Sequence, residues 1–169
     1  MGASLEETGS ARREGNRRLK GLARALLAPA FGAAIATSYA LAWLFLERAF
    51  TPRVLTASLY FAIAGTLSAG AGLIAARLLA KRRGNARIAA VLICLVAGTA
   101  GFATLFFTLD IVLTHHRLSE IPIRISLIIL GISGAGTMYN MLAVAAPIIV
   151  PLGLPMIVLF ALLIARTPR

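Results

Sequence analysis

The amino-acid sequence predicts an all-α protein, a polytopic transmembrane helix bundle with four clear spans, the last of which continues into a proline-broken C-terminal segment. Hydrophobic residues make up 59% of the 169 residues and charged residues only 14%, whereas soluble domains carry about 25% charged residues. Four apolar runs reach the roughly 20 residues that a helix needs to cross a hydrocarbon core. Basic residues gather at the ends of these runs and between them. A chain with so little polar surface needs lipid around it.

The first three spans follow a basic N-terminal tail. We expect this tail in residues 1–24 and a single transmembrane domain in residues 25–169. Within that domain, the first three spans cover about residues 28–46, 54–79 and 88–113.

The C-terminal apolar stretch is too long for one crossing. Its 41 residues, 125–165, would form a helix of about 60 Å at 1.5 Å per residue. Prolines at spacing four, Pro147, Pro151 and Pro155, interrupt it, and each removes a backbone donor and opposes the preceding helical turn. Either a tight hairpin divides the stretch, giving five spans with the last two at 125–146 and 148–165, or a broken helix carries a re-entrant half. The length favours the hairpin.

The distribution of lysine and arginine predicts the orientation, because these residues favour cytoplasmic loops. The tail and the second loop hold eleven basic residues, while the first and third loops hold four. We therefore expect a multi-pass protein of the cell membrane with a cytoplasmic N-terminus, and the composition favours a bacterial inner membrane. Five spans leave Arg166 and Arg169 outside, which the rule disfavours, whereas four crossings place them inside. The number of crossings stays open.

The net charge of +11 would indicate nucleic-acid binding in a soluble protein. Here the charge lies in the tail and loops, so we expect no nucleic-acid partner and attribute the charge to topology. The basic tail predicts contact with anionic lipid headgroups of the bilayer, where each basic residue contributes about 1 kcal/mol. A solvated extension of the first helix is an equally open alternative.

Pairs of small residues spaced four apart occur in the first four spans. Such residues share a helix face and let two backbones approach closely. They predict helix packing, within one bundle or between subunits of a homo-oligomer or larger membrane complex, although abundant alanine and glycine also produce chance pairs. The pairs are Gly32 and Ala36, Ser68 and Gly72, Ala97 and Gly101, and Gly131 and Ala135.

The middles of the spans contain no ionisable side chain, although coupled transporters usually place one there. The deepest strongly polar side chain is Asn140. Together with polar neighbours and the carbonyls freed by the prolines it could line a solute pathway, but hydrogen bonding between helices is the more common role of such an asparagine. The other candidate lining residues are Ser133, Thr137, Tyr139, Pro147 and Pro151.

Both histidines fall in the segment DIVLTHHRLSE, residues 110–120. Asp110, His115, His116 and Glu120 are weak candidates for a metal site, since adjacent histidines on a helix point about 100° apart and a zinc site needs three or four converging ligands. We predict no metal and no cofactor, and favour an ordinary outer loop.

These patterns predict a small integral inner-membrane protein that is a non-catalytic subunit or scaffold of a membrane complex. The chain contains no nucleotide-binding loop and no recognisable catalytic constellation, so enzymatic activity is not expected. The alternative is a small oligomeric transporter or channel for an uncharged or weakly charged solute.

Overall fold

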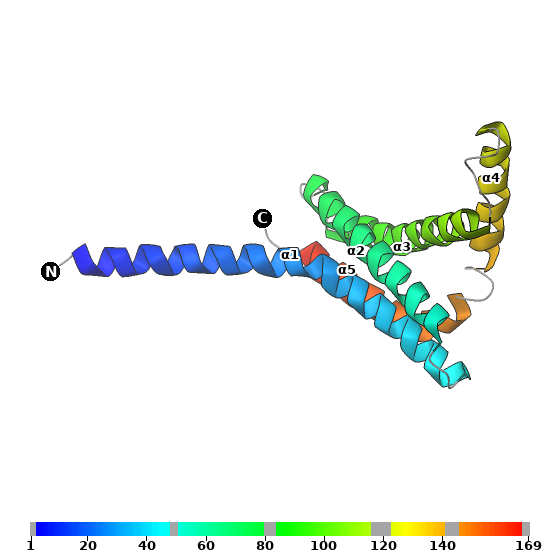
Figure 1. Cartoon of the computed structure of the whole chain (residues 1–169). Coiled ribbons are helices and arrows are strands. Elements are labelled where there is room, and N and C mark those ends of the chain that lie inside the picture. The colour runs from blue at the N-terminus through cyan, green and yellow to red at the C-terminus, as the bar shows by residue number, and fades with distance from the viewer. Residues whose placement is uncertain (1–2, 48–50, 80–83, 116–122, 141–145, 167–169) are drawn as a thin grey trace.

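A computed structural model describes residues 3–47, 51–79, 84–115, 123–140 and 146–166, with side chains placed at 21–46, 51–79, 84–114, 124–140 and 150–166. These residues form five α-helices, as Figure 1 shows: α1 (Ala3–Glu47), α2 (Pro52–Leu78), α3 (Gly84–His115), α4 (Ile123–Asn140) and α5 (Ala146–Arg166). The predicted all-α helix bundle is confirmed.

Three of these helices are long and apolar enough to cross a membrane: Gly21–Leu46, Pro52–Leu78 and Gly84–Thr114. Val150–Arg166 is a shorter apolar helix. The outer surfaces of the helices are apolar, with Leu59 and Ile93 about 60% exposed, whereas the hydroxyl residue Ser68 is fully buried. This distribution requires an apolar solvent around the bundle, and it supports insertion in a membrane.

The first helix includes the basic segment. Its backbone is helical without interruption over 45 residues, so the segment is a continuation of the first span rather than a separate element. Pro29 lies inside α1 and removes one hydrogen bond of the helical ladder, which bends helices. Figure 1 shows that α1 changes direction where it reaches α5 and that its N-terminal part projects away from the other helices.

The second helix begins at a well-defined cap. Thr51 is extended, and its side chain accepts a hydrogen bond of 3.4 Å from the Val54 backbone N–H. Pro52 occupies the first helical turn, where a missing N–H costs nothing. These three residues fix the start of α2 and therefore its register against α1.

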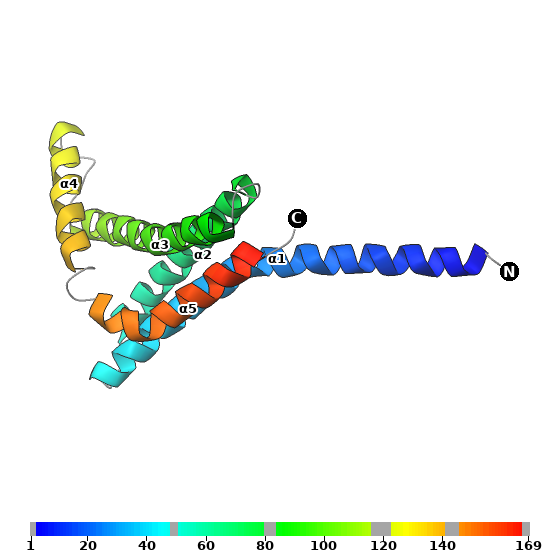
Figure 2. The same cartoon turned by 180° about the vertical axis from the view of Figure 1, so that it is seen from behind.

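The helices pack with α2 between α1 and α3, and α5 lies alongside α1 (Figures 1 and 2). The rings of Phe31 and Phe160 meet at 5.3 Å between α1 and α5, and Ile35 and Ile164 are buried in the same core cluster. Both views show α5 antiparallel to α1, so that the C-terminal end of α5 lies beside the start of the apolar part of α1. Helix α4 packs on α3 and stands across its end.

The C-terminal stretch forms two helices, but the hairpin expected within Pro147–Pro155 is wrong. Helix α5 runs unbroken from Ala146 to Arg166 and contains Pro151 and Pro155. A proline in the first turn of a helix costs little, and prolines spaced four apart place the missing donors on one side of the helix. The two helices are α4, which ends at Asn140, and α5, which begins at Ala146.

Candidate functional site

Helices α1 and α2 cross at two glycines. A Cβ atom on Gly65 would lie 2.9 Å from the Cα of Gly32, and one on Gly32 would overlap the Thr66 hydroxyl and the Ala62 carbonyl oxygen. The Thr66 hydroxyl donates a 2.8 Å hydrogen bond to the Ala62 carbonyl of its own helix. The two backbones are therefore in close contact. This close approach increases the dispersion contacts between the helices, which matter because lipid supplies no hydrophobic driving force for helix association. Ala36, one turn further along α1, is half-buried.

Helices α2 and α3 cross at Ser68 and Gly98, where a Cβ on the glycine would lie 2.7 Å from the Ser68 Cβ. The Ser68 hydroxyl lies 2.9 Å from the Gly65 carbonyl and 2.8 Å from the Thr99 hydroxyl. A serine has a single hydroxyl hydrogen. If Ser68 donates it to the carbonyl, Thr99 donates to Ser68. This buried pair ties α2 to α3. Further along the same crossing, a Cβ atom on Gly72 would lie 3.5 Å from the Val91 side chain.

The small pairs of α3 and α4 occupy a different environment. Ala97, Gly101, Gly131 and Ala135 are exposed, and nothing lies within 4 Å of a Cβ built on either glycine. Helix α4 uses Gly134 instead, whose Cβ position is 3.8 Å from the Thr108 side chain of α3. Small residues spaced four apart lie at two helix crossings inside the bundle, whereas the small residues at the same spacing on α3 and α4 are exposed.

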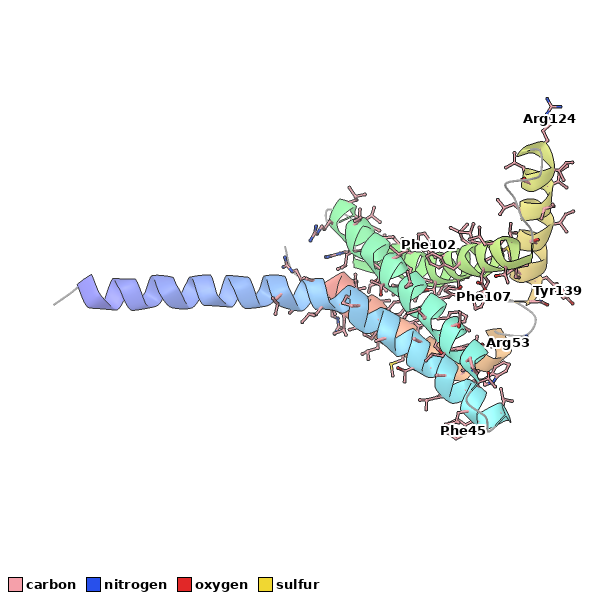
Figure 3. All side chains as sticks on the ribbon, viewed as in Figure 1. Phe45, Arg53, Phe102, Phe107, Arg124 and Tyr139 are labelled. Carbon is pink, nitrogen blue, oxygen red and sulfur yellow. The ribbon has the colours of Figure 1, made fainter. Side chains whose placement is uncertain are left out.

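The candidate lining residues of α4 lie on different sides of the helix. Thr137 is buried against α3 and its hydroxyl donates a 2.8 Å hydrogen bond to the Ser133 carbonyl. Tyr139 and Asn140 are exposed, and Figure 3 shows Tyr139 at the end of α4. Pro151 is exposed on α5, which packs on α1, α2 and α3, and the side chain of Pro147 lies outside the described residues. No common lining surface forms among the described members of this set.

An aromatic cluster joins the three membrane-length helices. It consists of Tyr39 and Trp43 on α1, Tyr60 and Phe61 on α2, and Phe106 and Phe107 on α3. Phe107 lies at its centre, with ring centroids 5.2 Å from Tyr60 and 5.9 Å from Phe61. Tyr39 contacts Phe61 at 4.8 Å. Within the described part of the chain, the buried Trp43 indole nitrogen has no hydrogen-bond partner.

A carboxylate adjoins this cluster. Asp110 is exposed and follows Phe106 by four residues on α3, so the two side chains share a helix face. The charge of Asp110 acts on the Tyr60 hydroxyl of α2. Asp110 lies five residues before the end of α3 at His115, or about 8 Å along the helix. An ionisable residue at this depth is a functional candidate whose partner has to be identified; its neighbour on α2 is Tyr60. The adjacent aromatics at 60–61 and 106–107 were a signal in the sequence for this pairing.

The other members of the histidine segment are only partly described. His116 and Glu120 lie outside the described residues, as does the side chain of His115. Among the side chains that the structure does place, no group of three or more His, Cys, Asp or Glu residues could hold a metal ion.

No protein-family model, curated protein or solved structure matches this chain. Function is therefore inferred from the geometry of the chain itself.

Proposed function

We propose that this protein is a non-catalytic integral membrane subunit that assembles with further copies of itself through the small-residue faces of α3 and α4. The observation that carries the proposal is the exposure of Ala97 and Gly101 on α3 and of Gly131 and Ala135 on α4. Helix association in lipid depends on close backbone packing. The chain uses that packing at Gly32 and at Gly98, while the pairs on α3 and α4 remain open to a partner helix.

The exposed side of α4 supports the same proposal. Ile125, Ile128, Ile132 and Tyr139 are each about half or more exposed, and with Ala135 they recur at spacings of three and four, so they share one helix face. The hydroxyl-bearing Thr137 is buried on the opposite side, against α3. On such a helix the large apolar side chains can contact lipid, and the small residue between them lets another helix approach closely.

The charge distribution supports an inner-membrane location with both termini of the chain on the cytoplasmic side. Arg77 lies in the last turn of α2 and Arg166 ends α5, and Arg24 and Arg87 lie near the starts of the spans in α1 and α3. In Figures 1 and 2 the end of α2, the start of α3 and the end of α5 lie toward the same end of the bundle, where the apolar part of α1 begins. This supports four crossings, by α1, α2, α3 and α5, over five. The basic end then faces anionic headgroups of the cytoplasmic leaflet.

Replacing Gly131 with leucine tests the assembly proposal. In liposomes that contain donor- and acceptor-labelled copies, we expect energy transfer between wild-type chains and a roughly fivefold weaker self-association of Gly131→Leu, because the larger side chain holds the partner helix away.

The matched control is Gly70→Leu. Gly70 lies on α2, outside the small-residue faces of α3 and α4, and nothing lies within 4 Å of its Cβ position. Gly70→Leu is expected to associate like the wild type. Equal losses in both variants, or no energy transfer between wild-type chains, would contradict the proposal.

A further inference from the structure

The aromatic cluster is directed into the bundle rather than toward lipid. Aromatic residues that anchor a helix at the membrane interface project outward to the headgroups, as Phe45 does, which is 76% exposed at the end of α1. In contrast, Phe61 is only 3% exposed, and Phe107 lies between α2 and α3 in contact with two other rings (Figure 3). Five of the six rings, all except that of Phe61, are half-buried, so the cluster presents ring surface at its margin.

The electrostatics of this margin are negative. The face of an aromatic ring carries negative potential that attracts cations within about 6 Å of its centroid. Asp110 adds a formal negative charge beside the Tyr60 ring, and its carboxylate is exposed. Charge and ring faces therefore favour the same sign of ligand.

The residues around the Asp110 carboxylate determine which kind of cation fits. Ca²⁺ and Mg²⁺ take about six or more oxygen ligands and a zinc site needs three or four converging ligands, whereas the rings around Asp110 are supplied by phenylalanine and tyrosine. Organic cations with apolar substituents match both features, since their charge attracts the carboxylate and ring faces while their substituents remain in contact with apolar surface.

We propose that Asp110 and the aromatic cluster form a binding site for a hydrophobic organic cation of the quaternary ammonium or phosphonium class. The site is built by α1, α2 and α3 and is independent of the assembly surface on α4. Tyr60 supplies a ring beside the Asp110 carboxylate, and Phe107 supplies the central ring of the wall.

The chain supplies its own reporter for this site, because it contains a single tryptophan, Trp43, whose ring lies 6.2 Å from that of Tyr39 in the cluster. Titration of the detergent-solubilised full chain with tetraphenylphosphonium is expected to change Trp43 fluorescence in a saturable manner. Asp110→Asn retains the size of the side chain but removes its charge. We expect it to bind roughly tenfold more weakly.

Two matched controls separate this site from partitioning into the micelle. Phe107→Leu is expected to weaken binding several-fold, whereas Phe45→Leu, which removes an exposed ring at the end of α1, retains wild-type affinity. Triphenylphosphine oxide, a neutral aryl phosphorus compound, is expected to give no saturable signal. Equal affinity of Asp110→Asn and the wild type, or saturable binding of the neutral compound with the same affinity, would overturn the proposal. Circular dichroism spectra of all variants verify that the helices are intact.

Discussion

Gly32→Leu is expected to lower the free energy of unfolding by about 3 kcal/mol, at the upper end of typical overpacking costs. The Cβ atom of the new side chain would overlap the Thr66 hydroxyl and the Ala62 carbonyl oxygen of α2. A backbone carbonyl cannot rotate away as a flexible side chain can, so α1 and α2 must separate and give up the contacts at their crossing. The measurement is equilibrium unfolding in mixed micelles with increasing denaturing detergent, followed by circular dichroism and by Trp43 fluorescence.

Gly70→Leu is the control for this substitution. Gly70 is another glycine at mid-helix, in α2, and nothing lies within 4 Å of its Cβ position. Its replacement is expected to change the free energy of unfolding by no more than about 1 kcal/mol, or to stabilise the helix slightly, since leucine has the higher helix propensity. Similar losses for the two variants would show that α1 and α2 do not cross at Gly32.

Gly98→Leu is expected to lower the free energy of unfolding by about 2 to 3 kcal/mol. A Cβ at this position would lie 2.7 Å from the Ser68 Cβ, so the substitution pushes α3 away from α2 and also stretches the Ser68–Thr99 hydrogen bond. That hydrogen bond alone is a minor part of the effect, because such bonds average about 0.6 kcal/mol in membrane proteins.

The neighbouring Gly101 provides the comparison. It lies three residues along the same helix, is exposed, and has open space at its Cβ position. At a high ratio of detergent to protein, where chains are separate, Gly101→Leu should keep the free energy of unfolding within about 1 kcal/mol of the wild type. A loss as large as that of Gly98→Leu would place the α2–α3 crossing elsewhere on α3.

The extent of the helices could be predicted from the sequence because it depends on local composition. Spans expected at 54–79 and 88–113 correspond to α2 (Pro52–Leu78) and α3 (Gly84–His115). The expected hairpin in Pro147–Pro155 was wrong because prolines were counted as breaks. Their effect depends on whether neighbouring groups satisfy the freed carbonyls, and the spacing of four keeps these carbonyls on one side of α5.

Helix contacts could be predicted only in part. The spacing of Gly32 and of Ser68 indicated residues that do lie at crossings, but the same spacing at Gly131 and Ala135 lies on an exposed face. Residue spacing describes one helix and contains no information about which face meets another helix. Gly65 and Gly98 belong to the tightest contacts, yet neither was singled out by its own spacing.

The contact between Asp110 and Tyr60 could not be predicted from the sequence, for a related reason. Helix rise locates Asp110 near the end of its span, and this depth agrees with its place near the end of α3. Its partner is 50 positions earlier, and the pairing depends on the antiparallel register of α2 and α3 that the Ser68–Gly98 crossing sets.

The most direct test of the proposed architecture is the side of the membrane on which the C-terminus lies. Helix α5 runs back along α1 and ends beside the start of its apolar part, so four crossings return the chain to the cytoplasm with α4 and its small-residue face at the opposite end. Fusions of the full chain to a fluorescent protein and to alkaline phosphatase at the C-terminus measure this side. We expect the first fusion to be fluorescent and the second to be inactive. An active phosphatase with a dark fluorescent fusion would mean five crossings and would contradict the proposed architecture.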